Sequence, residues 1–394
     1  IGLAWHTFAP VRQIVCTARP QNGPPQHHRP QRASHSSHGA AGRAGAGYCA
    51  VALILNANAP GALDAAVAML QRGQLVGMPT ETVYGLAAHA DDAQAVARIF
   101  AAKDRPHDHP LIVHIAAGNG PMAWRQAVLH YAESVPDVAW RLMEAVWPGP
   151  LTVIVPRRAG VGEAAAGGQP TIGLRCPGHP ATQALLQAAQ LQGLWGIAAP
   201  SANRFGRVSP TTAQHVMDEF DGRLSDDELL VLDAGPCPVG IESTIVDASR
   251  GRLVLLRPGM LDVQDLSAQL GVVFEVADAQ APKASGTLES HYAPRAKVVL
   301  INSLDLPARL ARLSTADAAH TALYVRQPVQ VPAGAHLQAM PHHAAACAQE
   351  LFAVLRQLDS MGVSSIWVEA PPAGPVWDLS LIHISEPTRL LSNS

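Results

Sequence analysis

The chain has 394 residues, of which 48% are hydrophobic and 15% charged, with a formal net charge of -3. This size can supply two packed domains, and the charge argues against a chain dominated by polycationic nucleic-acid binding. Five cysteines, without a Cys-x-x-Cys pair, indicate neither a disulfide framework nor a zinc knuckle. With no apolar run near the roughly 18 to 20 residues of a membrane helix, we expect a cytoplasmic protein.

The first segment with a regular pattern starts at Pro60. Residues 1–48 lack acidic residues and are rich in Arg, His, Pro, Ser and Gly, so we expect a disordered or non-native tail there. An organellar transit peptide is the alternative, although this segment has no clear amphipathic period. Leu63, Val67 and Leu70 then have helical spacing, and Gly73 is placed as a C-terminal cap before a strand at 75–78.

Helical and strand-like segments alternate along the next part of the chain. Asp91 and Asp92 predict the start of an alanine-rich helix that reaches Phe100. Strand-like runs follow at 111–115, 151–155, 171–174, 196–199 and 243–247. The alternation predicts an α/β domain over residues 49–262, in which helices flank a twisted sheet. The sheet is expected to be mostly mixed, because several connections are too short for a crossover helix.

A second, smaller unit is expected further along. Residues 263–296 contain Pro282, Gly286 and Pro294 and predict a linker. Strands at 297–301, 321–325 and 365–369, with a helix at 344–358, predict a Rossmann-like C-terminal α/β domain over 297–378. It lacks a Gly-x-Gly-x-x-Gly loop, so no dinucleotide is expected. Residues 379–394 look like translated adapter sequence, which predicts a non-native tail and a truncated second domain.

Four separated motifs carry the chemistry of the chain. They are Pro-Thr-Glu-Thr-Val-Tyr-Gly-Leu at 79–86, Lys-Asp-Arg-Pro at 103–106 with Pro-Leu-Ile-Val-His at 110–114, Pro-Ser-Ala-Asn at 200–203, and Glu-Ser-Thr-Ile-Val-Asp at 242–247. In this order they resemble the YrdC-like threonylcarbamoyl-AMP synthase family, two-domain type. The resemblance implies a YrdC-like fold and a nucleotidyltransferase, an L-threonylcarbamoyladenylate synthase. Its substrates would be L-threonine, bicarbonate and ATP, its products the adenylate and pyrophosphate, and its role the threonylcarbamoyladenosine modification of tRNA.

The same resemblance implies roles for individual residues. Those expected to act in catalysis are Lys103, Arg105, Ser201 and Asn203. Those expected to bind threonine are Thr82, His114, Arg175 and Ser201. Those expected to bind ATP are Arg105, His109, Thr171, Asn203, Thr211, Ser243 and Arg257. His291 and Tyr292, in the linker, are expected to form a lid over the active site that protects a labile adenylate from water.

The residue types allow alternative interpretations. Lys103 and Arg105 follow a helix, where cations can bind phosphate or complete a solvated helix end. Arg175 ends an apolar strand, where open α/β sheets place ligands, although it could be a surface charge. His109 stands where the family usually has asparagine, which introduces a group that can titrate near neutral pH. Glu81 and Asp247 are interpreted as structural carboxylates, Glu81 fixing its loop or holding magnesium through water, rather than as acid/base groups.

Cofactor and partners follow from these assignments. Mg²⁺ is expected with ATP, without a metal site made of protein ligands. The downstream partner is expected to be the tRNA threonylcarbamoyl-transferase complex, and direct contact with RNA is possible. The alternative function is a non-catalytic double-stranded RNA-binding module of the same fold, in which Arg204, Arg207 and the cations above would contact phosphates.

Overall fold

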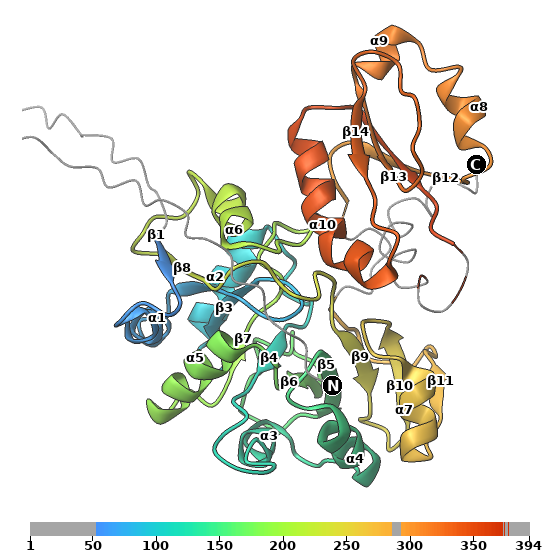
Figure 1. Ribbon diagram of the computed structural model, residues 1–394. Coiled ribbons are helices and arrows are strands. Elements are labelled where there is room, and N and C mark those ends of the chain that lie inside the picture. The colour runs from blue at the N-terminus through green and yellow to red at the C-terminus, as the bar shows by residue number, and fades with distance from the viewer. Residues whose placement is uncertain (1–52, 286–292, 373, 375–376, 378–394) are drawn as a thin grey trace, which may run out of the picture. The chain divides into compact units, whose positions relative to one another are not determined.

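A computed structural model describes residues 53–285, 293–372, 374 and 377 of the chain. Within these residues, no helix combines the length and the apolar character needed to cross a membrane. The described residues form two sheets, one of eleven strands and one of four, each with helices packed against it (Figure 1). The expected tails and the expected lid residues His291 and Tyr292 lie outside the described residues.

The larger sheet is mixed, as the sequence predicted. In spatial order its strands are β1 (Leu53–Asn56), β8 (Leu229–Asp233), β2 (Leu75–Met78), β3 (Gly85–His89), β7 (Ile197–Ala198), β4 (Ile112–His114), β6 (Thr171–Arg175), β5 (Leu151–Pro156), β9 (Thr244–Asp247), β10 (Leu253–Arg257) and β11 (Phe274–Val276). The β1–β8–β2 pairs are parallel, while β3 and β7 run antiparallel to both of their neighbours. The motifs of the sequence therefore enter this sheet from strands that are far apart in the chain.

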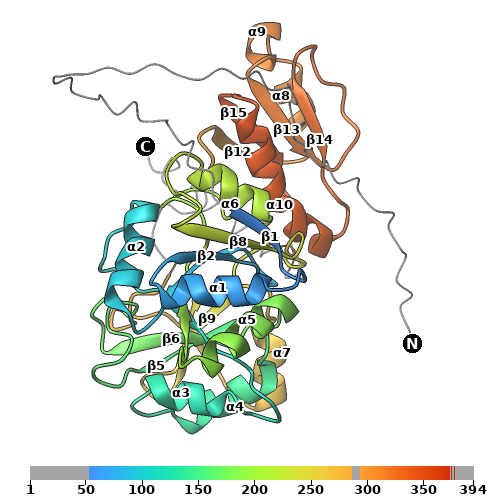
Figure 2. The ribbon, with the colours of Figure 1, turned by 90° about the vertical axis from the view of Figure 1, so that its left-hand side faces the viewer.

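Helices cover both faces of the larger sheet. They are α1 (Ala62–Gln71), α2 (Ala93–Lys103), α3 (Arg125–Tyr131), α4 (Asp137–Val146), α5 (Pro180–Leu191), α6 (Ala213–Phe220) and α7 (Val263–Leu270). Successive strand residues point to opposite faces: Leu75 joins the core under α2, α3, α4 and α6, whereas Val76 joins the core under α1 and α5. Figure 2 shows α1 and α5 lying near each other. This two-sided burial explains why β2 is apolar throughout.

The cap of α2 fixes the start of the helix that carries the first cationic motif. Asp92 accepts hydrogen bonds from the backbone N–H groups of Gln94 and Ala95, as the sequence suggested. Asp91 has a different role, because its carboxylate accepts from the Tyr131 hydroxyl at 3.0 Å and from the Gly162 N–H at 3.0 Å. The helix ends at Lys103, and Asp104 follows in the left-handed region with φ 53°.

The expected linker over 263–296 was partly wrong. Its first part forms α7 and β11, and β11 pairs with β10 as the last strand of the larger sheet. Asp262 caps α7 by accepting from Gln264 N–H and Asp265 N–H. The turn-forming residues that predicted a linker lie only after this strand, which is why composition averaged over 263–296 concealed it.

The C-terminal sheet is small and parallel. Its strand order is β12 (Lys297–Ile301), β15 (Ser365–Glu369), β13 (Thr321–Val325) and β14 (His336–Ala339), and its helices are α8 (Leu306–Leu310), α9 (Thr315–Ala318) and α10 (Ala344–Ser360). All five residues of β13 are buried, since the sheet is covered on both faces. The predicted strands and the α10 helix are confirmed, and the arrangement is Rossmann-like.

Candidate active site

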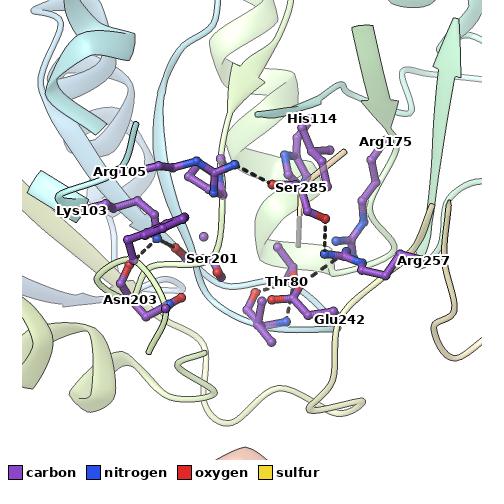
Figure 3. A pocket seen from close by; sticks show the side chains of 17 residues that line it. Thr80, Lys103, Arg105, His114, Arg175, Ser201, Asn203, Glu242, Arg257 and Ser285 are labelled. Atoms are coloured by element: carbon purple, nitrogen blue, oxygen red, sulfur yellow. Dashed lines mark hydrogen bonds and ion pairs between the residues drawn. The ribbon is translucent and has the colours of Figure 1, made fainter. Parts of the chain in front are cut away.

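A polar cavity opens where the four motifs meet on the larger sheet (Figure 3). Its volume is about 40 Å³. The residues that line it are Thr80, Val83, Gly85, Lys103, Arg105, Ile112, His114, Arg175, Ala199, Pro200, Ser201, Asn203, Phe205, Gly206, Glu242, Arg257 and Ser285. Seven of the residues singled out in the sequence are among them: Lys103, Arg105, His114, Arg175, Ser201, Asn203 and Arg257.

The turn between β2 and β3 forms one wall of the cavity. The Thr80 hydroxyl accepts from the N–H groups of Thr82 and Val83, at 3.1 and 3.2 Å, and donates to the Val83 carbonyl at 2.6 Å. The Thr82 hydroxyl lies 2.9 Å from that of Thr80 and is fully buried, so Thr80 rather than Thr82 lines the cavity. The role of Thr82 in binding threonine stays a prediction.

Lys103 lies at the centre of the cationic side of the cavity. Its side chain is buried, and its ammonium donates to the main-chain carbonyls of Ser201 and Asn203. Burial, with a smaller contribution from the nearby Arg105, lowers the pKa of Lys103 to about 7. A lysine poised in this way carries a charge that a phosphate ligand would stabilise.

Two arginines complete this side. Arg105 donates to the Pro110 carbonyl at 2.9 Å and to the Ser285 hydroxyl at 3.2 Å. Arg257 donates to the carbonyl and the hydroxyl of Ser243, each at 3.0 Å, and to the Ser285 carbonyl at 3.0 Å. Ser243 thus lies behind Arg257 and orients it, while Ser285 covers both guanidinium groups. Figure 3 shows Ser285 between the two arginines.

Arg175 and His114 also line the cavity, on adjacent parallel strands, and Figure 3 shows Arg175 near Arg257. They are partners in the register of β4 and β6, so their side chains leave the same face of the sheet. Arg175 Nη2 lies 2.7 Å from Glu81 Oε1, and the two side chains form a buried ion pair. Among the described residues, Arg175 Nε and His114 Nδ1 have no hydrogen-bond partner. These buried groups are available to a ligand.

Burial and the Arg175 charge determine the protonation states of His114 and Glu81. Burial, together with the Arg175 charge, lowers the pKa of His114 to about 3, so its imidazole is neutral at physiological pH. Burial alone would raise the pKa of Glu81, but the Arg175 guanidinium holds it below the ordinary value. Glu81 is therefore an ionised partner of Arg175, which fits its interpretation as a structural carboxylate. Asp247 is structural too, accepting from Ser249 N–H at 2.9 Å.

The remaining predicted ATP residues lie outside this cavity. Thr171 lines a smaller neighbouring pocket of about 20 Å³, which shares Ile112 and Ser285 with the main cavity. His109 packs edge-on against the Phe205 ring, with centroids 5.4 Å apart, and burial and Arg105 lower its pKa, so it stays neutral at pH 7. The Thr211 N–H and hydroxyl face His215 Nδ1 at 3.3 and 3.4 Å. Contact of these side chains with a nucleotide stays a prediction.

Sequence reasoning missed four lining residues, Thr80, Phe205, Glu242 and Ser285. Thr80 and Glu242 lie inside recognised motifs, so their positions could have identified them. Glu242 accepts from the Ser209 hydroxyl at 2.8 Å and lies 3.5 Å from Arg257. Ser285 gave no local signal, because it reaches the cavity only through the path of the chain after β11.

Among the residues that the structure describes, no group of three or more His, Cys, Asp or Glu could hold a metal ion. Glu242 is the carboxylate that lines the cavity among these cations. A magnesium ion here would therefore need oxygen ligands from a phosphate ligand and from water, which is how Mg²⁺ is commonly held.

Comparisons with known proteins agree with this geometry. Residues 68–259 match a Sua5/YciO/YrdC family model described as "Telomere recombination", and residues 260–379 match "Threonylcarbamoyl-AMP synthase, C-terminal domain". Curated threonylcarbamoyl-AMP synthases from Pyrococcus abyssi and Bacillus subtilis are 38% and 37% identical, over 60% and 62% of this chain. These alignments cover 66% and 68% of the two relatives, so the match spans about two thirds of their length.

A solved structure covers more of the fold. The crystal structure of P. abyssi Sua5 complexed with L-threonine has a TM-score of 0.75 at 30% identity, and the match covers 86% of this chain and 97% of that one. Both sheets, the order of the motifs and the two family matches thus point to the same conclusion. The chain belongs to the two-domain threonylcarbamoyl-AMP synthase family, whose members are nucleotidyltransferase-type enzymes.

Proposed function

We propose that this chain converts L-threonine, bicarbonate and ATP into L-threonylcarbamoyladenylate and pyrophosphate. The observation that carries the proposal is the division of one buried cavity into two groups. Lys103, Arg105 and Arg257 form a cationic group, and Arg175 with neutral His114 forms a group with unsatisfied polar atoms. The relatives named threonylcarbamoyl-AMP synthase support the assignment.

The cationic group suits a triphosphate. Guanidinium groups bind phosphate oxygens through paired hydrogen bonds, whereas an ammonium acts as a compact charge. Arg105 and Arg257 supply the former and Lys103 the latter, and all three side chains are at least nine-tenths buried. Burial weakens competition from water, so these contacts count for more than at an exposed surface.

The second group suits the threonine. Arg175 would bind the carboxylate through its Nε, while its Nη2 stays in the ion pair with Glu81 that keeps the guanidinium in place. His114 would hydrogen-bond the substrate as a neutral imidazole, without repelling a protonated amine. The Sua5 structure with bound L-threonine supports a threonine site in this fold.

The chemistry then needs positioning more than a nucleophilic side chain. The threonine amine adds to the carbon derived from bicarbonate, and a carbamate forms with loss of water. A carbamate oxygen then attacks the α-phosphorus of ATP, and the bond to the β-phosphate oxygen breaks, so that pyrophosphate leaves with the electron pair. Lys103, Arg105 and Arg257 would stabilise the charge that develops on the phosphates, while Ser201 and Asn203 position Lys103.

Magnesium would enter this site with ATP. Its ligands would be phosphate oxygens and water, with Glu242 as the nearest protein carboxylate to contribute directly or through water. When bound, the ion would neutralise phosphate charge alongside the arginines.

A nucleotide requires the cavity to enlarge. A volume of about 40 Å³ lies far below the roughly 300 Å³ or more of typical ligand pockets. Ala284 packs with Ile112, Ile154 and Ile245, and Ser285 binds the two arginines. Displacement of Ala284 and Ser285 would expose an apolar surface for a base, and would open Arg105 and Arg257 toward its phosphates. The proposed lid residues His291 and Tyr292 follow six and seven positions after Ser285 in the chain.

Downstream, the adenylate would pass to the tRNA threonylcarbamoyl-transferase complex. We place the protein in the cytoplasm, where the buried free thiols of Cys176, Cys237 and Cys347 would stay reduced. Direct RNA contact is a secondary proposal. A non-catalytic RNA-binding module is not favoured, because the curated relatives are named as synthases.

Pyrophosphate release tests the proposed function. The protein is incubated with ATP and Mg²⁺, with threonine and bicarbonate added separately and together. Release that requires both supports the proposal, and Arg257→Ala should reduce it. Release independent of threonine would instead indicate a general ATPase, and no release from folded protein would reject the synthase activity.

A further inference from the structure

A second cavity, of about 270 Å³, lies beside helices α6 and α10. Four arginines line it: Arg204 and Arg207 from the turn after β7, Arg295 from the segment before β12, and Arg356 from α10. The proposed synthase activity does not use this cavity. Its volume is larger than that of the main cavity and just below the roughly 300 Å³ at which pockets for drug-sized ligands begin.

One buried carboxylate lies close to three of these four arginines. Glu219, with 4% of its side chain exposed, accepts from Arg356 at 2.9 Å and from Arg204 Nε at 3.2 Å, and lies 4.0 Å from Arg207 Nε. The other lining carboxylates are engaged elsewhere: Asp359 accepts from the Ala296 N–H and Asp218 from the Gln214 side chain. The lining thus carries four guanidinium groups against three carboxylates, an excess of one positive charge.

Arg207 and Arg295 keep free donors. Among the described residues, neither guanidinium makes a hydrogen bond, and the nearest carboxylate oxygen to Arg207 is that of Glu219, already shared by two other arginines. Burial, then Arg204 and Arg295, lowers the pKa of Arg207, the signature of cations held close together. Bringing like charges together costs free energy, which an anion between them would recover.

We propose that this second cavity binds a small oligophosphate anion, such as inorganic pyrophosphate, between Arg207 and Arg295. Phosphate fits better than a carboxylate, because several guanidinium forks can each bind two of its oxygens and its charge matches more than one cation. A cavity of this size accommodates the anion more readily than a whole nucleotide. The proposal depends on these arginines and not on turnover at the main cavity.

A single turn connects the two cavities. Asn203, Phe205 and Gly206 line the main cavity, while Arg204 and Arg207 line the second. The Asn203 amide donates to the carbonyls of Arg204 and Arg207, at 2.8 and 2.7 Å, and the Asn203 carbonyl accepts from Lys103. An anion on Arg207 thus contacts the turn that positions Lys103.

Calorimetric titration of the full chain with inorganic pyrophosphate, without nucleotide or threonine, tests the proposal. Arg257→Ala weakens the main site, and in this background we expect one remaining binding event. Adding Arg207→Ala and Arg295→Ala should weaken that event at least tenfold, whereas the exposed control Arg312→Ala should leave it unchanged. Arg207→Lys with Arg295→Lys should restore part of the affinity. If the alanine pair lowers Tm, Arg207→Gln with Arg295→Gln replaces it.

Two results would overturn the proposal. One is loss of all pyrophosphate binding in Arg257→Ala alone, which would assign binding to the main cavity. The other is pyrophosphate binding in that background that ignores Arg207 and Arg295. A short duplex RNA, titrated in parallel, separates the sources of phosphate: RNA binding that depends on these arginines without pyrophosphate binding also counts against the proposal. These binding outcomes can be interpreted even if the synthase assay fails, because they do not depend on turnover.

Discussion

The ammonium of Lys103 donates to the main-chain carbonyl of Asn203, although the two residues are separated by 100 positions in the chain. One ends helix α2 and the other lies in the turn after β7. The contact joins two of the motifs around a fully buried cation. It accounts for the order of the Lys-x-Arg and Ser-x-Asn segments: the second provides carbonyls that replace the water lost by the first.

Replacing Lys103 should lower the enzymatic activity while the protein stays folded. In Lys103→Met we expect pyrophosphate release to fall at least about a hundredfold, since the removed charge acts on the phosphates. The fold should persist, because the methionine fills the same buried space without a charge to desolvate. Steady-state rates and Tm measure the two effects. Near-normal turnover in a folded variant would remove Lys103 from the active machinery.

The same lysine predicts a pH dependence of stability. Its pKa is about 7 in the folded state, below the ordinary 10.5, so between these values the unfolded chain binds a proton that the folded chain releases. The free energy of unfolding should therefore rise with pH across this window, by at most about 1.4 kcal/mol per pH unit from this group. Denaturant titrations of wild type and Lys103→Met should differ by this slope. Parallel curves would contradict the lowered pKa.

Arg175 is expected to control threonine affinity. Arg175→Ala removes a charge-assisted hydrogen bond to the substrate carboxylate, worth about 1.5–3 kcal/mol, so the KM for threonine should rise by about 10- to 100-fold. ATP binding should change less than about twofold. The exposed Arg158→Ala is a matched control. An effect on ATP alone would move Arg175 to the nucleotide half of the cavity.

Ser285 is expected to compete with the nucleotide. Its hydroxyl accepts from Arg105, so Ser285→Ala frees a donor that ATP phosphates can use, and ATP should bind about threefold tighter, the lower end of one hydrogen bond. Equilibrium binding of ATP to the two proteins measures this. Weaker binding in the variant would show that Ser285 contacts the ligand instead of blocking it.

His109 should tolerate the residue usual at its position. Because burial and Arg105 lower its pKa and it lies outside the main cavity against Phe205, His109→Asn should change the KM for ATP by less than about threefold between pH 7 and 8. Kinetics at several pH values checks this. A larger change would place the imidazole in contact with the nucleotide.

The sequence predicted the motifs better than the geometry around them. Lys103, Arg175 and Asn203 could be found because they lie in motifs that resemble those of a known family, whereas their residue types alone also fit structural roles. Strands β3, β8 and β10 were not predicted: β3 begins inside a functional motif, whereas β8 and β10 are apolar runs that the sequence analysis did not assign. Ser285 was not singled out within the expected linker, since its position depends on β11, the edge strand that pairs with β10.

Hydrogen bonds within the folded turn also determine which of two threonines faces the cavity. Thr80 and Thr82 are equivalent in composition and both belong to the first motif. The Thr80 hydroxyl closes the turn through the N–H of Val83, which leaves it at the cavity wall and buries Thr82. Such turn geometry depends on hydrogen bonds that a residue pattern does not encode.

The most direct measurement is the fate of isotope-labelled bicarbonate. The protein is incubated with ¹³C-bicarbonate, L-threonine, ATP and Mg²⁺. The products are separated quickly and their masses are measured by mass spectrometry. We predict one species that contains threonine, AMP and the labelled carbon, in proportion to released pyrophosphate and strongly reduced in Arg257→Ala. Pyrophosphate and AMP formed without any labelled adenylate would contradict the account.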